Sequence, residues 1–216
     1  MRDEAAARAF ILANTTLMAP PHVPEIRLHL AEKAHDLWLK TEEELGIIGL
    51  PPPFWAFAWA GGQGLARYVL DHPEKVAGRR VLDFATGSGL VAIAACRAGA
   101  ASVTASDVDA WANVACRLNA AANAVLFDVT TDDVIGRIGG FDLLLAGDVF
   151  YDREMTASLL PWFDTLAGAG VTVLVGDPGR SYCPKDRLTA LAVYEVPVLT
   201  ALEDSAVKRT TVWRYG

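Results

Sequence analysis

The sequence predicts an α/β protein whose sheet is doubly wound and mostly parallel, with an antiparallel edge at its C-terminal end. Between residues 80 and 175, short apolar or β-branched runs alternate with longer alanine-rich amphipathic stretches, the pattern of strands joined by helical crossovers. Strands connected in this way lie parallel, with helices on both faces of the sheet. Two strand-like runs at 191–198 and 206–215 then follow one another without a helix between them, and they predict the antiparallel edge.

The individual elements follow from the same patterns. Short apolar or β-branched runs indicate strands, and stretches that keep apolar residues on one face, as Trp111, Ala115 and Leu118 do, indicate helices. A glycine such as Gly99 marks the end of a helix. The predicted elements are, in chain order, a strand at 80–84, a helix at 90–97, a strand at 102–106, a helix at 110–122, a short strand at 125–127, a strand at 141–146, a helix at 153–166 and a strand at 171–175.

The N-terminal part of the chain is predicted to be an extension, residues 1–50, that packs on the core formed by residues 51–216. The alanine-rich residues 3–13 predict a helix, and residues 26–30 alternate between apolar and polar side chains as a strand does. The three prolines at 51–53 predict an extended turn.

The composition is that of one cytoplasmic domain. The chain has 216 residues, 52% of them hydrophobic and 21% charged, which excludes a disordered or low-complexity protein. Its apolar runs are far shorter than the ~20 residues of a membrane span. The first residues include Asp3 and Glu4 and lead into no long apolar stretch, so they do not have the pattern of a secretory signal or transit peptide. We therefore expect a cytoplasmic protein without a membrane partner.

Charge and cysteine content narrow the partners further. The chain has 19 basic and 26 acidic residues and a formal net charge of −7, which disfavours nucleic acid because phosphate neutralisation supplies most of that affinity. The negative net charge favours a basic partner over nucleic acid. The three cysteines are widely separated and form no C-x-x-C pair, so we expect no metal site.

The most informative segment is the glycine turn after the strand at 80–84. Gly87 and Gly89 allow a sharp turn and let a ligand approach the backbone. The segment reads G-x-G-x-x-A, which also matches the dinucleotide fingerprint. Asp107 lies 20 residues beyond Gly87, where a carboxylate accepts hydrogen bonds from the ribose of either NAD or S-adenosylmethionine. The turn alone therefore leaves both cofactors open.

Asp83 distinguishes between the two cofactors. Its carboxylate would repel a pyrophosphate at the helix N-terminus, whereas the aminoacyl tail of S-adenosylmethionine carries an ammonium group that it would attract. The alternative is that Asp83 only caps the turn through backbone amides. Asp128, just past the short strand at 125–127, is a candidate contact for the adenine amino group, or else a solvated turn residue. The residues thus favour S-adenosylmethionine.

Asp148 and Tyr151 follow the strand at 141–146 and are candidates for the acceptor pocket, because open α/β sheets bind ligands at the carboxyl ends of their strands. A methyl-accepting amine has to be oriented, stripped of water and neutral when it attacks. Asp148 could orient the amine and Tyr151 could pack over its cationic form. The alternative is an ordinary strand exit with core aromatics.

A dense aromatic cluster, Trp55, Phe57 and Trp59, precedes the glycine turn in the chain. Aromatic side chains of this kind cover a cofactor, grip a partner or belong to the core, and the sequence leaves these three roles open.

Several segments together resemble a known family: 54–68, 81–83, 147–152 and 176–180. The chain resembles the seven-strand protein lysine methyltransferases, and within them the enzymes that act on the β subunit of electron-transfer flavoprotein. The resemblance implies a Rossmann-like methyltransferase domain over 51–216 that binds S-adenosyl-L-methionine and methylates protein lysines. It implies cofactor contacts by Trp59, Asp83, Ala85, Gly87 and Asp107, with Ser88 and Val108 as candidates beside them, and Asp148 and Tyr151 as catalytic groups at the lysine channel.

The sequence departs from the family at Ala85, where glycine is commoner, and we expect a negative φ there. Two other functions compete with protein methylation. Base N-methyltransferases place D-P-P-Y-like segments where this chain has Val149 and Phe150, and an NAD-dependent oxidoreductase rests on the G-x-G-x-x-A match alone. We expect a monomer that acts on the electron-transfer flavoprotein β subunit.

Overall fold

The computed structural model describes residues 4–31, 53–198 and 205–216. The turn expected at 51–53 falls outside these residues apart from Pro53, and so does the boundary expected at residue 50, which stays a prediction.

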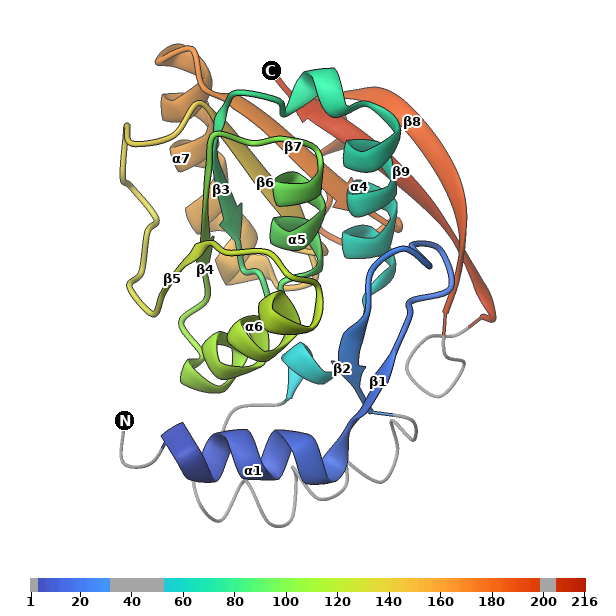
Figure 1. The fold of residues 1–216 in the computed structure, drawn as a ribbon. Helices are drawn as coiled ribbons and strands as arrows, with labels where there is room; N and C mark the ends of the chain where they lie inside the picture. Colours follow the sequence, from blue (N-terminus) through green and yellow to red (C-terminus); the bar gives the residue numbers. More distant parts are fainter. Residues whose placement is uncertain (1–3, 32–52, 199–204) are drawn as a thin grey trace.

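The described residues form one large sheet with strand order β5-β4-β3-β6-β7-β9-β8 (Figure 1). The first five strands in this order, from β5 through β4, β3 and β6 to β7, pair in parallel. Strand β9 runs antiparallel to both of its neighbours, β7 and β8. The expected doubly wound, mostly parallel fold with an antiparallel C-terminal edge is therefore confirmed. The strands are β3 (Arg80–Phe84), β4 (Ser102–Ser106), β5 (Asp128–Thr130), β6 (Leu143–Gly147), β7 (Thr172–Asp177), β8 (Leu188–Pro197) and β9 (Val207–Tyr215).

Helices cover both faces of this sheet. In Figure 1, α4, α5 and α6 lie on one face and α7 lies on the other. No helix among the described residues is long and apolar enough to cross a membrane. The long helices are α1 (Glu4–Asn14), α4 (Ala60–Asp71), α5 (Leu90–Arg97), α6 (Ala110–Ala122) and α7 (Arg153–Gly168).

Alternate residues of the central strands supply two separate cores. Leu143 and Leu145 of β6 point to the face covered by α4 and α5, and Leu144 points to the opposite face, against α7. All three are fully buried. This is why the strands read as continuous apolar runs in the sequence, because both of their faces are covered.

One strand of the sheet was placed wrongly by the sequence pattern. The apolar run at 125–127 predicts a strand, but β5 begins at Asp128. Residues 123–125 belong to the terminal turn of α6, since Ala124 has a φ of +54° and the Val125 N–H donates to the Ala120 carbonyl at 3.1 Å. Leu126 is 95% exposed. The prediction was wrong because these apolar side chains follow the end of the helix and precede the sheet.

The N-terminal segment packs beside the sheet against α6. Helix α1 is followed by a short antiparallel pair, β1 (Thr16–Met18) and β2 (Leu28–Leu30), which confirms the expected helix and strand. Ala7 and Ile11 of α1 share a hydrophobic cluster with Trp55 and Phe57. In Figure 1, α1 lies beside α6. The short 3₁₀ helix η2 (Phe54–Ala56) then leads toward α4.

Candidate active site

A cavity of about 510 Å³ opens at the carboxyl ends of β3, β4 and β6, which is the usual position and size for a ligand site in this kind of sheet. Its wall comes from η2, the start of α4, and the segments that follow β3, β4, β5, β6 and β7. Nine of the predicted site residues line it, namely Trp59, Asp83, Ala85, Gly87, Ser88, Asp107, Val108, Asp148 and Tyr151.

The glycine turn after β3 presents bare backbone to this cavity. Gly87 has a φ of +53°, in the left-handed region that favours glycine. Its N–H donates to Asp107 Oδ2 at 2.9 Å, which ties the turn after β3 to the end of β4. A Cβ added at Gly87 would meet no atom closer than 3.9 Å, so the space beside its backbone is open to a ligand.

Asp83 lies beneath this turn and is almost fully buried. Its Oδ2 accepts hydrogen bonds from the Thr86 hydroxyl and, at 2.9 Å, from the Ala92 N–H. Burial raises the pKa of Asp83 to about 7, against the opposing effect of these two hydrogen bonds. The carboxyl therefore caps the turn, and it also lines the cavity. Its contact with a cofactor stays a prediction.

Ala85 corrects one expectation. Its φ is +52°, in the left-handed region, whereas we expected a negative value. In this conformation an alanine is less stable than a glycine by about 1 kcal/mol or slightly more, because its Cβ crowds the following carbonyl. The backbone at Ala85 thus follows the path that a glycine would take, and the alanine stores local strain at the cavity wall.

The end of β4 supplies the next part of the wall. Asp107 Oδ1 accepts from the Asp109 N–H at 3.0 Å, and burial raises the pKa of Asp107. Asp109 caps α6 by accepting from the Trp111 N–H at 2.8 Å, and burial raises its pKa to about 6. Between them, Val108 is 73% exposed and presents an apolar side chain to the cavity.

Asp128 is not part of this site. It is the exposed first residue of β5, at the end of the strand opposite to the cavity, and it does not line the wall. The misplaced strand explains the error, because the carboxyl end of β5 lies at Thr130. Asp132 and Asp133, which follow that end, line the cavity instead, and the correct strand boundary would have identified them.

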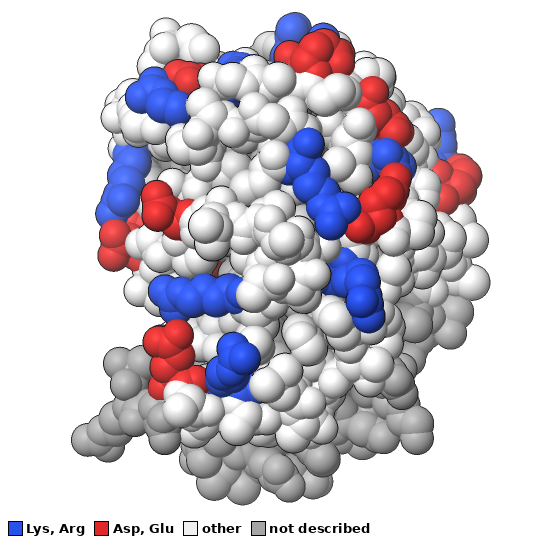
Figure 2. Space-filling view, viewed as in Figure 1, with Lys and Arg blue, Asp and Glu red and all other residues white. Residues whose placement is uncertain are grey.

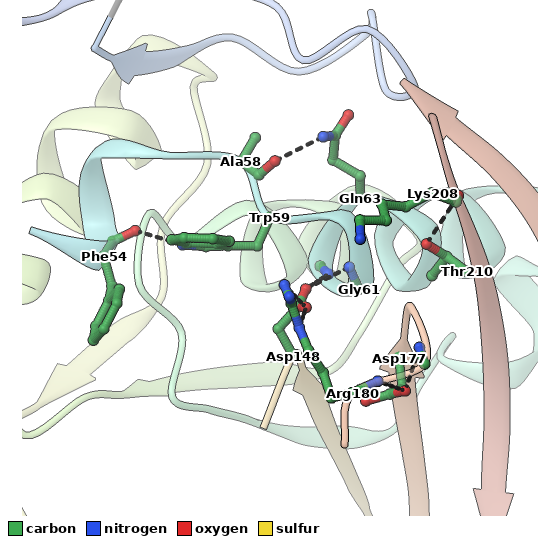
Figure 3. A network of polar contacts seen from close by, with 12 residues as sticks. Phe54, Ala58, Trp59, Gly61, Gln63, Asp148, Asp177, Arg180, Lys208 and Thr210 are labelled. Atoms are coloured by element: carbon green, nitrogen blue, oxygen red, sulfur yellow. Dashed lines mark hydrogen bonds and ion pairs between the residues drawn. The ribbon is translucent and has the colours of Figure 1, made fainter. Parts of the chain in front are cut away.

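Asp148 follows β6 directly and is held by four donors. Its Oδ2 accepts from the backbone N–H groups of Gly61 and, at 3.2 Å, Gly62 at the start of α4. Its Oδ1 accepts from Arg180, at 2.9 Å from Nε and 2.7 Å from Nη2 (Figure 3). A carboxylate has about four lone-pair sites, so Asp148 has no free site for a further donor.

The surroundings of Asp148 also shift its pKa. Its side chain is buried, and burial raises the pKa of Asp148 to about 6 although Arg180 and the Gly61 amide oppose the shift. Its φ is +58°, a conformation that aspartate tolerates better than most residues. Asp148 was expected to orient an amine, and in this structure both of its oxygens already accept hydrogen bonds from the protein. Its role toward an amine stays a prediction.

Three glycines explain how α4 reaches Asp148. A Cβ added at Gly61 would overlap the Gly176 carbonyl of β7, and one at Gly176 would overlap the Gly61 carbonyl. A Cβ at Gly147 of β6 would lie 2.8 Å from the Gly62 Cα. The helix start therefore rests directly on the strand backbones, and its N–H groups and positive dipole end point at the carboxylate.

The sequence analysis identified Arg180 only within a family segment. Asp177, at the end of β7, accepts from the backbone N–H groups of Gly179 at 2.7 Å and Arg180 at 3.0 Å, which fixes the loop that carries the guanidinium. The guanidinium carbon lies 5.9 Å from the ring centroid of Trp59. Trp59 is held in turn by a 3.0 Å hydrogen bond from Nε1 to the Phe54 carbonyl (Figure 3). The position of Arg180 directly after β7, the neighbour of β6 in the sheet, was the signal that could have placed it beside Asp148.

The outer rim of the cavity is aromatic. Tyr151 is 50% exposed, and its ring lies 5.9 Å from that of Phe54. Burial of its inner part raises the pKa of Tyr151. Trp55 and Phe57 are buried in the cluster with α1 and also line the cavity, so the aromatic segment is both core and cavity wall.

The cavity as a whole favours a cation. Among the described residues that line it, Arg180 is the one basic side chain. Acidic side chains in a partly closed cavity attract cations and repel phosphates. The acidic residues of the wall are Asp83, Asp107, Asp109, Asp132, Asp133 and Asp148.

Comparison with known proteins gives a consistent result. A protein of Xenopus laevis named electron transfer flavoprotein beta subunit lysine methyltransferase is 40% identical over 96% of this chain and 86% of its own length. The Homo sapiens protein of the same name is 33% identical over 96% of this chain and 81% of its own length. The family model described as ribosomal protein L11 methyltransferase (PrmA) matches residues 66–146.

The solved structures agree on the fold. The structure of magnesium protoporphyrin IX methyltransferase from Synechocystis PCC 6803 with bound SAM superposes with a TM-score of 0.53, over 72% of this chain and 80% of that one. The two sequences are only 14% identical, so this likeness bears on the fold alone.

Proposed function

The chain belongs to the family of electron transfer flavoprotein beta subunit lysine methyltransferases, and from this premise we propose that it transfers methyl groups from S-adenosyl-L-methionine to lysine side chains of the electron-transfer flavoprotein β subunit. The observation that carries the proposal is the acid-lined cavity at the strand ends, with bare backbone at Gly87 on one side and the Asp148–Arg180 pair on the other. Both groups that the reaction brings together, a sulfonium and a lysine, are cationic in water.

The residues present fit the cofactor. When bound, S-adenosylmethionine supplies a methyl group activated by its positive sulfur. Asp83 and the open backbone at Gly87 would hold its aminoacyl end, since a carboxylate there favours an ammonium. Asp107 would accept from the ribose hydroxyls, and the exposed Val108 side chain would pack on the adenine.

The residues of the chain that face the acceptor have a different task. The aromatic rim of Phe54 and Tyr151 gives the aliphatic part of a lysine an apolar path and excludes water from it. Trp59 closes the inner wall, fixed by its hydrogen bond to the Phe54 carbonyl. Exclusion of water and a fixed approach are what an uncharged amine needs to act as a nucleophile.

The two competing functions have less support. An NAD cofactor would place a pyrophosphate beside Asp83 in a cavity lined by aspartates. A base methyltransferase would need room for a flipped base at Val149 and Phe150. Both side chains are buried, and Phe150 packs in the core against α7 and does not line the cavity. On the face shown in Figure 2, basic side chains lie scattered and next to acidic ones, without a continuous basic stripe.

The test is a methyl-transfer assay with the purified chain, labelled S-adenosylmethionine and purified electron-transfer flavoprotein. We expect label in the β subunit and a mass increase of whole methyl groups on lysine-containing peptides. S-adenosylhomocysteine should bind in calorimetry, and Asp83→Ala should weaken this binding severely. Absence of label in the β subunit would contradict the proposal, and label in added RNA or DNA would favour a base methyltransferase instead.

The monomeric state and the cytoplasmic location stay predictions from the sequence. Light scattering coupled to size-exclusion chromatography tests the first, and fractionation of cells that express the tagged chain tests the second.

A further inference from the structure

The ion pair between Arg180 and Asp148 has no role in holding the cofactor as described above. The pair lies in the wall of the same cavity, and Arg180 supplies the one basic side chain among the described residues of that wall. The side chain of Asp148 is 9% exposed and that of Arg180 is 21% exposed. Two charges this far from water strongly influence the protonation of any third ionisable group that enters.

The pair is held from both sides. Asp148 is fixed by the amides of Gly61 and Gly62 at the start of α4, and Arg180 is fixed by the backbone hydrogen bond that its N–H donates to Asp177. Trp59 lies against the guanidinium. The arrangement is therefore a built counterion for Asp148. Asp177, the last residue of β7, lies near the pair. The other titratable side chains that line the same cavity are Asp83, Asp107, Asp109, Asp132, Asp133 and Tyr151.

The protonation of the acceptor decides whether the reaction occurs. A lysine is an ammonium at neutral pH, since its ordinary pKa is about 10.4, and an ammonium has no lone pair for attack. A carboxylate with a free lone pair beside it would stabilise the ammonium and raise the lysine pKa further. Asp148 without Arg180 would be such a carboxylate.

We propose that Arg180 is a positioning residue that occupies Asp148 as its permanent counterion, so that the acceptor lysine enters the cavity as the neutral amine. The proposal rests on the proposed function, because it concerns the lysine substrate. It differs from a gate, in which the lysine ammonium would displace Arg180 and take its place on Asp148.

The chemical step balances as follows. The lysine ammonium gives one proton to solvent before or during entry. The nitrogen lone pair then forms the N–CH₃ bond while the S–CH₃ bond breaks, and the electron pair of that bond stays on sulfur, which becomes neutral. The methylated nitrogen is left as a cation, and the total charge is conserved.

The first test is the pH dependence of methyl transfer for three variants. In Arg180→Gln, Asp148 has no counterion and stabilises the ammonium, so the acid limb of kcat should move up by about one pH unit, which lowers kcat at neutral pH about tenfold. The loss should recover at alkaline pH, and KM should not rise. Arg180→Lys keeps the charge and should keep the limb near its original position. The control is Arg80→Gln, which should not move the limb. Arg80 is an exposed arginine paired with Asp142 at the amino ends of the strands, away from the cavity.

The second test needs no catalysis and uses the wild-type chain. Binding of the unmodified β subunit to the protein loaded with S-adenosylhomocysteine should release a proton at neutral pH, seen in calorimetry as a heat that depends on the ionisation enthalpy of the buffer. Arg180→Gln should release less. If this variant does not fold, the wild-type measurement alone decides.

The outcomes separate the two proposals. If the wild-type chain does not methylate the β subunit, the proposed function fails. If it does, but binding releases no proton, or Arg180→Gln lowers KM and leaves the pH profile unchanged, Arg180 is a gate and the present inference is overturned.

Discussion

Asp83 and Asp148 are two buried carboxylates that line one cavity, the first in β3 and the second directly after the neighbouring strand β6. Burial raises the pKa of each, to about 7 for Asp83 and about 6 for Asp148. They differ in their donors, because Asp148 has Arg180 beside it whereas Asp83 has a hydroxyl and a backbone amide. Asp148 therefore carries a balanced charge, and Asp83 carries one that a cationic ligand could balance.

The raised pKa of Asp83 predicts a pH-dependent stability. The folded state keeps the proton up to about pH 7, whereas the unfolded chain releases it near pH 4. Between these values the folded state binds more protons, so the free energy of unfolding decreases as pH rises, by at most about 1.4 kcal/mol per pH unit. Asp83→Asn should remove the part of this decrease between pH 6 and about 7. Thermal unfolding of both proteins across this range checks it.

A ligand control belongs with this measurement. A cation bound beside Asp83 favours the ionised carboxylate, so S-adenosylmethionine should bind more tightly to the wild-type chain as pH rises toward 8. Asp83→Asn should bind it weakly at every pH. Equal pH dependence of unfolding in the two proteins would show that Asp83 titrates as it does in the unfolded chain.

At the level of elements, the sequence was most informative where an element has ordinary chemistry. Helices α5 and α6 and strands β3 and β4 have the bounds that their alanine-rich and apolar runs predict. Helix α4 did not emerge as a helix, because glycines occupy its first two turns and lower its helix propensity. Gly61 is required by close packing on β7, and Gly64 by close packing on Thr210 of β9, so both depend on strands more than eighty residues away along the chain. Local pattern carries no trace of such a contact.

The start of α4 provides a matched pair of substitutions. Gly61→Ala should destabilise the protein by several kcal/mol and disturb Asp148, since its Cβ would overlap the Gly176 carbonyl and the Asp148 carboxylate. At Gly62 an added Cβ meets nothing within 4 Å, so Gly62→Ala should be neutral or stabilise by up to about 1 kcal/mol through helix propensity. Chemical denaturation of the two variants compares them directly. Similar stability in both would mean that the helix does not rest on β7 as described.

Across the whole molecule, the site is assembled from six segments that meet only in the folded chain. The predicted residues that proved to line the cavity, such as Asp83, Asp107 and Asp148, lie at the carboxyl ends of strands that the sequence places correctly or nearly so. Arg180 and Asp132 were not assigned from their own residue pattern, because their roles depend on which strands are neighbours and on where β5 ends. Strand order is a property of the whole sheet.

Helix α1 of the N-terminal segment contributes to this assembly, although none of its residues lines the cavity. Ile11 is fully buried in the cluster that contains Trp55 and Phe57, and these two aromatic side chains form part of the cavity wall. A helix outside the sheet thus supports the wall from behind. Because protein interiors are closely packed, a void at Ile11 should loosen Trp55 and Phe57, which belong to the same hydrophobic cluster.

Ile11→Ala should therefore lower stability by about 2–4 kcal/mol and also weaken the binding of S-adenosylhomocysteine several-fold. Leu166→Ala is the matched control, because Leu166 is equally buried, belongs to the core against α7 and does not line the cavity. It should lower stability by a similar amount and leave the affinity unchanged. Calorimetric titration of both variants, at a temperature where both are folded, distinguishes the two effects. Equal affinities would assign α1 a purely structural role, whereas a selective loss in Ile11→Ala would show that the N-terminal segment and the cavity form one cooperative unit.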